Sequence, residues 1–302
     1  MSLLARWNAR THRGLSFALL AMIGAGLFSF PYQQAIQEAS LLASVYGVFV
    51  WALAFSLPGA LKTGRETRLN WFTGGHAVVI ALLGVLGNYA VCAALEGSAP
   101  TLVMVITRSE IVIAMVLGWG ILKELVSKQV WSAVGVILFG ILLMRYESLS
   151  DSIASWAMVF WALTAAFSFA SIQVLSKRII HQVDPLALNV IRLIIALGLM
   201  SVFPGMLSEV REMSGHAWML LGLAAFFGPF IGRVSYTYAL RDLTIARAMT
   251  IGTCAPVLTL LIDALVFERV PSWLELLGGA VVLFGVLASF LRIPFFETHA
   301  AR

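Results

Sequence analysis

Long apolar segments separated by short polar stretches fill this chain almost from end to end. A helix needs about 20 apolar residues to cross a bilayer, and backbone groups in lipid must be satisfied within the segment, as they are in a helix. The pattern therefore predicts an all-α integral membrane protein with ten transmembrane helices. The expected spans are 14–32, 42–61, 73–94, 101–122, 130–146, 155–175, 186–204, 217–239, 246–267 and 273–291.

The second five segments repeat features of the first five. Ala94-Leu95, Met104 and Gly140 return as Ala239-Leu240, Met249 and Gly285, each 145 positions later; Phe28-Ser29-Phe30 with Gln34 returns as Phe167-Ser168-Phe169 with Gln173, and Pro58-Gly59 returns as Pro204-Gly205. These matches occur in order and at nearly constant offset, which indicates two repeats, 1–146 and 147–302. Because each repeat has five spans, an odd number, the second is inverted relative to the first, as in many transporters.

Composition excludes a soluble globular protein. Hydrophobic residues make up 60% of the chain and charged residues 12%, whereas about a quarter of the residues of a soluble domain are charged. Cys92 and Cys254 lie inside apolar runs and are expected to be buried core residues. The five histidines are scattered, so no metal site is expected, and motifs for phosphate binding or nucleophilic catalysis are missing. We therefore expect no cofactor and no enzymatic activity.

The basic residues lie in separate loops, which favours membrane orientation over nucleic-acid binding as the reason for the net charge of +5. Cytoplasmic loops carry an excess of Lys and Arg. If the N-terminus is cytoplasmic, fourteen such residues fall on the cytoplasmic side and three on the outer side. The fourteen are Arg6, Arg10, Arg13, Lys62, Arg65, Arg68, Lys123, Lys128, Lys177, Arg178, Arg241, Arg247, Arg292 and Arg302, and the three are Arg145, Arg211 and Arg269. This predicts a multi-pass membrane protein with both termini in the cytoplasm.

Charged residues inside the spans are the first candidates for function, since a charge at bilayer depth costs about 2.5–3.5 kcal/mol on insertion scales. Arg108 and Glu110 are two positions apart on the fourth span, about 200° around a helix, so they are expected on opposite faces. Glu110 lies near the midplane and is the candidate proton-coupling group. The alternative is a salt-bridged acid that joins two helices. Asp263 is expected to pair with Arg108, and breaking this ion pair would open a gate.

Asn88 and Arg233 occupy equivalent positions in the two repeats, 145 positions apart. Inversion would place them on opposite sides of the midplane, lining one pathway. The alternative is that each hydrogen-bonds a neighbouring helix. Arg192 is close to the cytoplasmic end of its span, so we expect its side chain to reach the interface in a structural role. The equivalent residues Gln34 and Gln173 either cap the ends of a cavity or are interfacial polar residues.

Two prolines, Pro229 and Pro256, are expected to interrupt the hydrogen-bond ladder of their helices. The carbonyl groups they free would bind substrate or kink the helix for packing. Gly228 and Gly232 have the spacing of a close helix–helix contact, and Tyr236, one turn further, would add an aromatic wall.

The ends of the two repeats carry the residues that connect this chain to a known family. Lys123-Glu124-Leu125 closes the fourth span and Gly135 to Gly140 lie in the fifth; Phe267-Glu268-Arg269 closes the ninth and Gly278-Gly279 to Gly285 lie in the tenth. With Pro256 and the apolar run to Glu268, the sequence resembles the EamA-type permeases of the drug/metabolite transporter superfamily over nearly its whole length. Ile111 or Val112 stands where the first repeat would carry a proline, which makes the fourth span the expected specificity element.

The resemblance implies a central cavity lined mainly by helices one, three, four, six, eight and nine, and movement of small metabolites, often outward, across the bacterial inner membrane. We therefore predict a secondary transporter of a small polar or amphipathic metabolite that works by alternating access. Arg108 or Arg233 would hold a substrate anion. Two other hypotheses stay open, an intramembrane lipid-handling protein or enzyme, and a passive channel. The expected partners are the substrate and the lipid bilayer, for a monomer or a homodimer.

Overall fold

The computed structural model describes residues 3–63, 70–96, 100–149, 155–266 and 270–290, and all of the regular secondary structure in these ranges is helical. The first repeat contains α1 (Leu3–Glu38), α2 (Leu41–Thr63), α3 (Trp71–Leu95), α4 (Pro100–Thr107), α5 (Glu110–Leu122) and α6 (Lys128–Leu149). The second contains α7 (Trp156–Ile179), α8 (Pro185–Met200), α9 (Met206–Glu212), α10 (Gly215–Ala225), the π-helix η2 (Phe226–Gly232), α11 (Arg233–Asp242), α12 (Ile245–Gly252), α13 (Ala255–Val266) and α14 (Trp273–Phe290).

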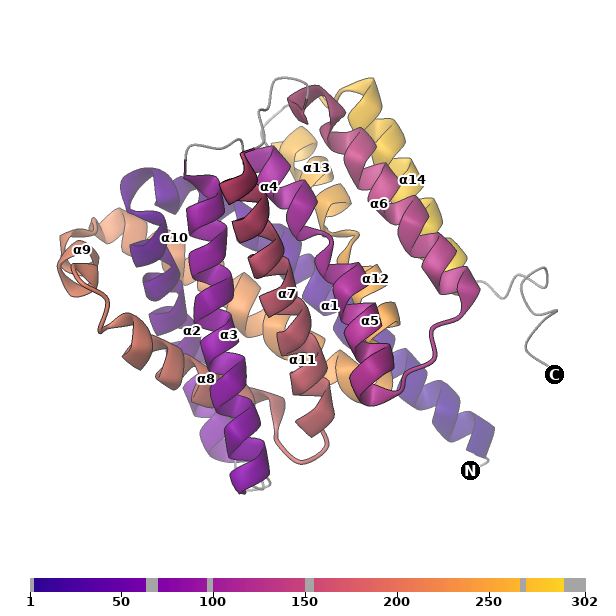
Figure 1. Cartoon of the computed structure of the whole chain (residues 1–302), viewed down its shortest axis with the longest axis horizontal. Helices are drawn as coiled ribbons and strands as arrows, with labels where there is room; N and C mark the ends of the chain where they lie inside the picture. Colours follow the sequence, from indigo (N-terminus) through magenta and orange to yellow (C-terminus); the bar gives the residue numbers. More distant parts are fainter. Residues whose placement is uncertain (1–2, 64–69, 97–99, 150–154, 267–269, 291–302) are drawn as a thin grey trace.

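These helices form ten membrane-crossing segments. In the described ranges nine helical segments have the length and hydropathy of a membrane span, and α8, with 16 residues, is the shorter tenth. Three crossings consist of more than one helix: α4 with α5, α10 with η2 and α11, and α12 with α13 (Figure 1). The ten predicted spans are therefore present, and their bounds differ from the expected ones most for α1, which begins at Leu3 and continues through Pro31 to Glu38. α8 ends at Met200, before its expected end.

Polar contacts show that successive segments alternate in direction. At one end of the bundle Arg13, early in α1, pairs with Asp242 at the end of α11, and Lys177 near the end of α7 pairs with Glu124 just after α5. We call this end, which is the lower one in Figure 1, the Lys177 end. The start of α6 contacts the end of α14 there as well.

The opposite end, here the Glu38 end, joins the end of α1 to the start of α10. Glu38 accepts hydrogen bonds from Ser214 and pairs with His216, both at 2.7 Å. Ser40, just before α2, donates to Glu209 of α9. The short helix α9 was not predicted; it begins after Gly205, whose positive φ of 81° suits glycine and turns the chain at this end.

The close crossing of α6 and α14 shows that the two repeats are related by an inversion (Figure 1). A Cβ atom at Gly140 would lie 2.8 Å from the carbonyl oxygen of Gly278, and one at Gly285 would lie 3.1 Å from that of Ala133. Gly285 and Gly278 are the equivalents of Gly140 and Ala133 at the offset of 145. The same contact thus occurs twice with the roles exchanged, as a two-fold axis requires. Ala133, which comes earlier in α6, contacts Gly285, which comes later in α14, whereas Gly140 contacts Gly278. The two helices are therefore antiparallel.

Both repeats break their fourth segment at the same place. α4 ends at Thr107 and α12 at Gly252, 145 positions later, and α5 and α13 begin at Glu110 and Ala255. At each break the chain tightens to i→i−3 hydrogen bonds, from Ser109 N to Ile106 O and from Cys254 N to Ile251 O, both 3.0 Å.

The fourth span of the first repeat is not one regular helix, which was the basis for placing Arg108 and Glu110 on opposite faces. The relative orientation of the two side chains stays a prediction. Arg108 lies in the break itself, and Glu110 is the first residue of a new helix. Angles around a continuous helix therefore do not apply to this pair. The break forms without a proline, since Ile111 occupies the position that Pro256 occupies in the second repeat.

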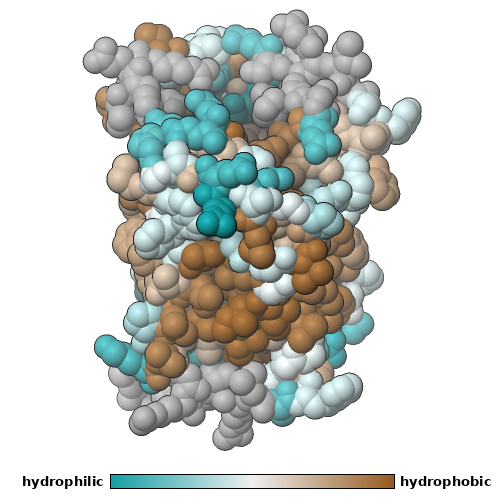
Figure 2. Space-filling model, turned by 90° about the vertical axis from the view of Figure 1, so that its left-hand side faces the viewer, coloured by the Kyte–Doolittle hydropathy of each residue, from teal (hydrophilic) through white to brown (hydrophobic). Residues whose placement is uncertain are grey.

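The surface of the bundle suits a bilayer. Figure 2 shows a broad apolar band across the lower middle part of one face, with hydrophilic residues gathered above it. Trp71 at the start of α3 is 94% exposed at the Lys177 end, and Trp156 at the start of α7 is 90% exposed at the Glu38 end. Tryptophan at both interfaces is the aromatic belt of a membrane protein. The chain is a multi-pass membrane protein.

Candidate substrate cavity

A cavity of about 340 Å³ lies inside the bundle between the two repeats. Its polar side chains are Asn88 from α3, Arg192 from α8, and Arg233 and Tyr236 from α11. Its aromatic walls are Phe28 from α1, Phe49 from α2 and Phe169 from α7. Three of the predicted site residues, Asn88, Arg233 and Tyr236, are thus brought to one cavity. Apolar walls with a few converging polar groups are typical of small-molecule sites.

Glycines bring α1 and η2 together at the wall of this cavity. A Cβ at Gly24 would lie 2.5 Å from the carbonyl oxygen of Phe227, and one at Gly228 would lie 2.5 Å from the ring of Phe28. Pro229 lies inside η2, where the equivalent part of the first repeat is regular α-helix in α3. π-Helical segments often accompany functional sites because they change which side chains and carbonyl groups face inward.

Asn189 of α8 connects η2 to a buried arginine. Its amide nitrogen donates to Ser56 Oγ at 2.8 Å and to the carbonyl oxygen of Pro229 at 3.3 Å, and its Oδ1 accepts from Nε of Arg192 at 2.9 Å. These hydrogen bonds fix the orientation of the Asn189 amide, and its Oδ1 in turn orients the guanidinium of Arg192.

The burial of Arg192 contradicts the prediction that its side chain reaches the interface. Only 9% of Arg192 is exposed, and the residue lies on the face of α8 that also buries Asn189 and Leu193. Seven positions of α8 separate it from Pro185, so the long side chain turns inward to the cavity instead of toward the end of the helix.

A chain of hydrogen bonds leads from the cavity to Glu110. Arg233 Nη1 donates to Gln173 Oε1 at 3.3 Å, and Gln173 Nε2 donates to Glu110 Oε1 at 3.3 Å. Gln173 is buried, so its interpretation as an interfacial residue was wrong. Its equivalent Gln34 is exposed near the end of α1 and is not among the described residues that line the cavity.

Arg108 and Glu110 are not among the described residues that line the cavity. Their charges interact across the helix break. The predicted partner Asp263 belongs to α13, but its side chain lies outside the described residues, so the Arg108–Asp263 gate stays a prediction. Pro256 lies in the first turn of α13, directly after the second helix break.

A polar cluster that sequence reasoning missed joins helices at the Lys177 end of the bundle. Lys177 pairs with Glu124 and also donates to the carbonyl oxygen of Leu243, and the second oxygen of Glu124 accepts from the backbone N–H of Ile245 at 3.0 Å. One carboxylate thus ties the end of α5 to α7 and to the turn before α12. The sequence pattern places Lys177 only in a positive loop and Glu124 only in the closing motif of the first repeat.

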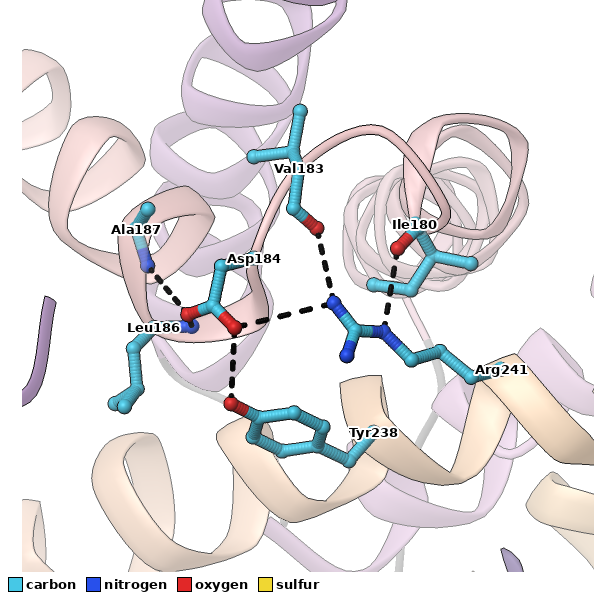
Figure 3. Close-up of polar contacts among 7 residues, drawn as sticks. All are labelled: Ile180, Val183, Asp184, Leu186, Ala187, Tyr238 and Arg241. Carbon is cyan, nitrogen blue, oxygen red and sulfur yellow. Dashed lines mark hydrogen bonds and ion pairs between the residues drawn. The ribbon is translucent and has the colours of Figure 1, made fainter. Parts of the chain in front are cut away.

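A second cluster joins the last turns of α11 to the turn between α7 and α8 (Figure 3). Tyr238 donates to Asp184 at 3.1 Å, and Arg241 lies 3.8 Å from the same carboxylate. Arg241 also donates to the carbonyl oxygens of Ile180 and Val183. The other oxygen of Asp184 caps the start of α8. Together with Arg13 and Asp242, these contacts join α1, α5, α7, α8, α11 and α12 at one end.

Inverted five-span repeats with discontinuous helices around a central cavity are an architecture found in many membrane transporters. The sequence model of the EamA-like transporter family matches residues 12–146 and 156–291, one match per repeat. The chain belongs to the EamA-like transporter family, and it is therefore a membrane transporter of the drug/metabolite transporter superfamily.

Comparison with solved structures agrees on the fold. A structure titled "Crystal structure of protein" is similar to this chain with a TM-score of 0.76 and 15% sequence identity, over 96% of this chain and 99% of that one. At this identity the likeness shows the shared fold alone. No curated protein matches the chain.

Proposed function

We propose that this protein is a secondary transporter that moves a small polar or amphipathic metabolite bearing an anionic group, by alternating access. The observation that carries the proposal is the position of Arg233, whose guanidinium lines the central cavity at the junction of η2 and α11. A charge buried at this depth needs a partner, and a substrate carboxylate or phosphate supplies it. The aromatic walls suit the apolar part of such a substrate.

The distribution of basic residues supports an inner-membrane protein with the Lys177 end in the cytoplasm and both termini on that side. In this orientation Lys177, Glu124 and their neighbours join the helices at the cytoplasmic end of the bundle, and we infer that they close the cavity on that side. Alternating access then requires these contacts to break while the Glu38 end closes. The two discontinuous crossings and η2 are the places where the helices bend most easily.

Glu110 is the proposed site of a coupling proton. Gln173 connects it to Arg233, so a substrate anion at Arg233 and a proton at Glu110 act on the same amide. The driving force would be a proton or substrate gradient.

Solute flux in proteoliposomes tests this function. Glu110→Gln should abolish uptake driven by a pH gradient and leave counterflow of preloaded substrate intact. Equal loss of both activities in a folded protein would contradict the role of Glu110. Flux without saturable counterflow would indicate a passive channel, and movement of lipid without movement of any soluble solute would indicate a lipid-handling protein.

A further inference from the structure

Arg192 has no acidic partner in the part of the chain that the structure describes. Its Nε donates to Asn189, a neutral amide, and no ion pair among the described residues reaches it. Only 9% of the residue is exposed. A buried charge without a counter-charge is strongly unfavourable, so a positive group kept in this position calls for an anion from outside the protein.

Arg233 directs a second positive charge into the same space. Both guanidinium groups line the main cavity, and both also line a small recess between α7, α8 and α11. Two like charges in one cavity of low dielectric repel each other unless an anion lies between them. The cavity thus carries two charges that one ligand can neutralise.

Glu110 balances only part of this excess. Its single charge interacts with both Arg233 and Arg108, and the amide of Gln173 lies between it and Arg233. Arg192 has no such interaction with an acid among the described side chains.

Tyr236 adds an unused donor to the same wall. Its hydroxyl is buried and has no hydrogen-bond partner among the described residues. It follows Arg233 by three positions on α11, so the two side chains are neighbours on the helix surface. Buried hydroxyl groups are normally satisfied. Because Tyr236 lines the cavity, a ligand bound there is the partner that we assign to this hydroxyl.

We propose that the cavity is a binding site for a water-soluble organic dianion, with Arg192, Arg233 and Tyr236 as its donors. The ligand carries two carboxylates or one phosphate, and its apolar part contacts Phe28, Phe49 and Phe169. This inference rests on the proposed transport function, because it names the substrate class of that function. It also gives Arg192 a role in specificity, since a monoanion would neutralise only one of the two guanidinium groups.

Thermal shift and titration calorimetry on the purified protein test the proposal with two matched pairs of probes. The pairs are benzoate with benzene-1,3-dicarboxylate, and butyrate with succinate. Within each pair the dianion should bind more tightly. Arg192→Gln should weaken binding of the dianion by about tenfold or more, the effect of a charge-assisted hydrogen bond, and change binding of the monoanion by less than about threefold. Arg211→Gln, the same substitution on the exposed helix α9, should change neither.

Tyr236→Phe removes only the hydroxyl and keeps the ring, so a loss of binding in this variant is not explained by loss of the fold. It should weaken binding of benzene-1,3-dicarboxylate several-fold without lowering the melting temperature of the ligand-free protein.

Equal affinity for monoanions and dianions, no stabilisation by either dianion, or stabilisation only by an anionic phospholipid would overturn the proposal. If the protein shows saturable counterflow of benzoate with no preference for the dianion, the transport function stands and this inference fails. If the dianion binds as expected but never crosses the membrane, the site stands and the transport function fails.

Discussion

Arg233 and Gln173 are joined by a hydrogen bond of 3.3 Å from Nη1 to Oε1, and this contact places the substrate cavity next to the intramembrane acid. The other end of the Gln173 amide donates to Glu110. One neutral side chain from α7 therefore touches the arginine of α11 and the glutamate of α5. A change in the charge of Arg233 or Glu110 therefore acts on the other residue through the orientation of the Gln173 amide.

Replacing Gln173 should uncouple these two sites. Gln173→Leu removes both hydrogen bonds but leaves Arg233 and Glu110 in place. We expect counterflow to change by less than about threefold and pH-driven uptake to fall by about tenfold, the effect of one hydrogen bond to a charged group. Both activities are measured in the same proteoliposomes. A parallel loss of the two would mean that Gln173 only supports the fold.

Asn189→Asp places a carboxylate where Arg192 has only an amide oxygen. Because the new acid neutralises Arg192 inside the protein, the variant should lose its preference for dianions over monoanions. Calorimetry with succinate and butyrate measures the ratio of the two affinities, and butyrate is the internal control for an intact cavity. A ratio unchanged from the parent protein would show that Arg192 does not contact the ligand.

The Lys177 end, which we propose is the closed one, should open when its central ion pair is removed. In a protein with Cys92 and Cys254 replaced by alanine, Ser176→Cys places a thiol in the recess beside Arg192 and Arg233. Lys177→Gln should increase the rate at which a water-soluble thiol reagent added from that side labels this cysteine. Lys62→Gln, an exposed lysine on the same side, is the control. Labelling at the same rate in all three proteins would exclude a gating role for Lys177 and Glu124.

The glycine crossing of α6 and α14 should tolerate no added methyl group. Gly140→Ala would force a Cβ to within 2.8 Å of the Gly278 carbonyl oxygen, and overpacking of this kind costs about 1–3 kcal/mol. Gly135 lies on the same helix with no atom within 4 Å of its Cβ position. Gly135→Ala should therefore be neutral or stabilising, since alanine favours the helix. The melting temperatures of the two variants are measured in detergent. Similar values would contradict the close contact between α6 and α14.

The sequence was sufficient for the architecture because a duplicated membrane unit leaves strong signals. Ten apolar runs predict ten crossings, and the offset of 145 between Gly140 and Gly285 is the offset at which the structure repeats its closest helix contact. The helix break at Arg108 was not predicted, because no proline marks it. It is recognised only from its equivalence to the break beside Pro256.

The site was harder to predict because burial depends on tertiary packing. Arg192 was expected at an interface from its distance to the end of its span, but α8 is short and turns this residue toward the cavity. Gln173 and Gln34 are equivalent in sequence, yet one is buried between two charged residues and the other is exposed. Inverted repeats share a fold and need not share environments, since the two copies face different ends of one asymmetric cavity.

Counterflow of a radiolabelled anion tests the central claim most directly. Proteoliposomes are preloaded with unlabelled benzene-1,3-dicarboxylate, and uptake of the labelled compound is followed for the parent protein and for Arg233→Gln. The account predicts saturable counterflow that is lost in Arg233→Gln and retained in Arg211→Gln. Uptake by the parent protein that is linear in concentration, or counterflow that survives in Arg233→Gln, would contradict a transporter that holds its anionic substrate at Arg233.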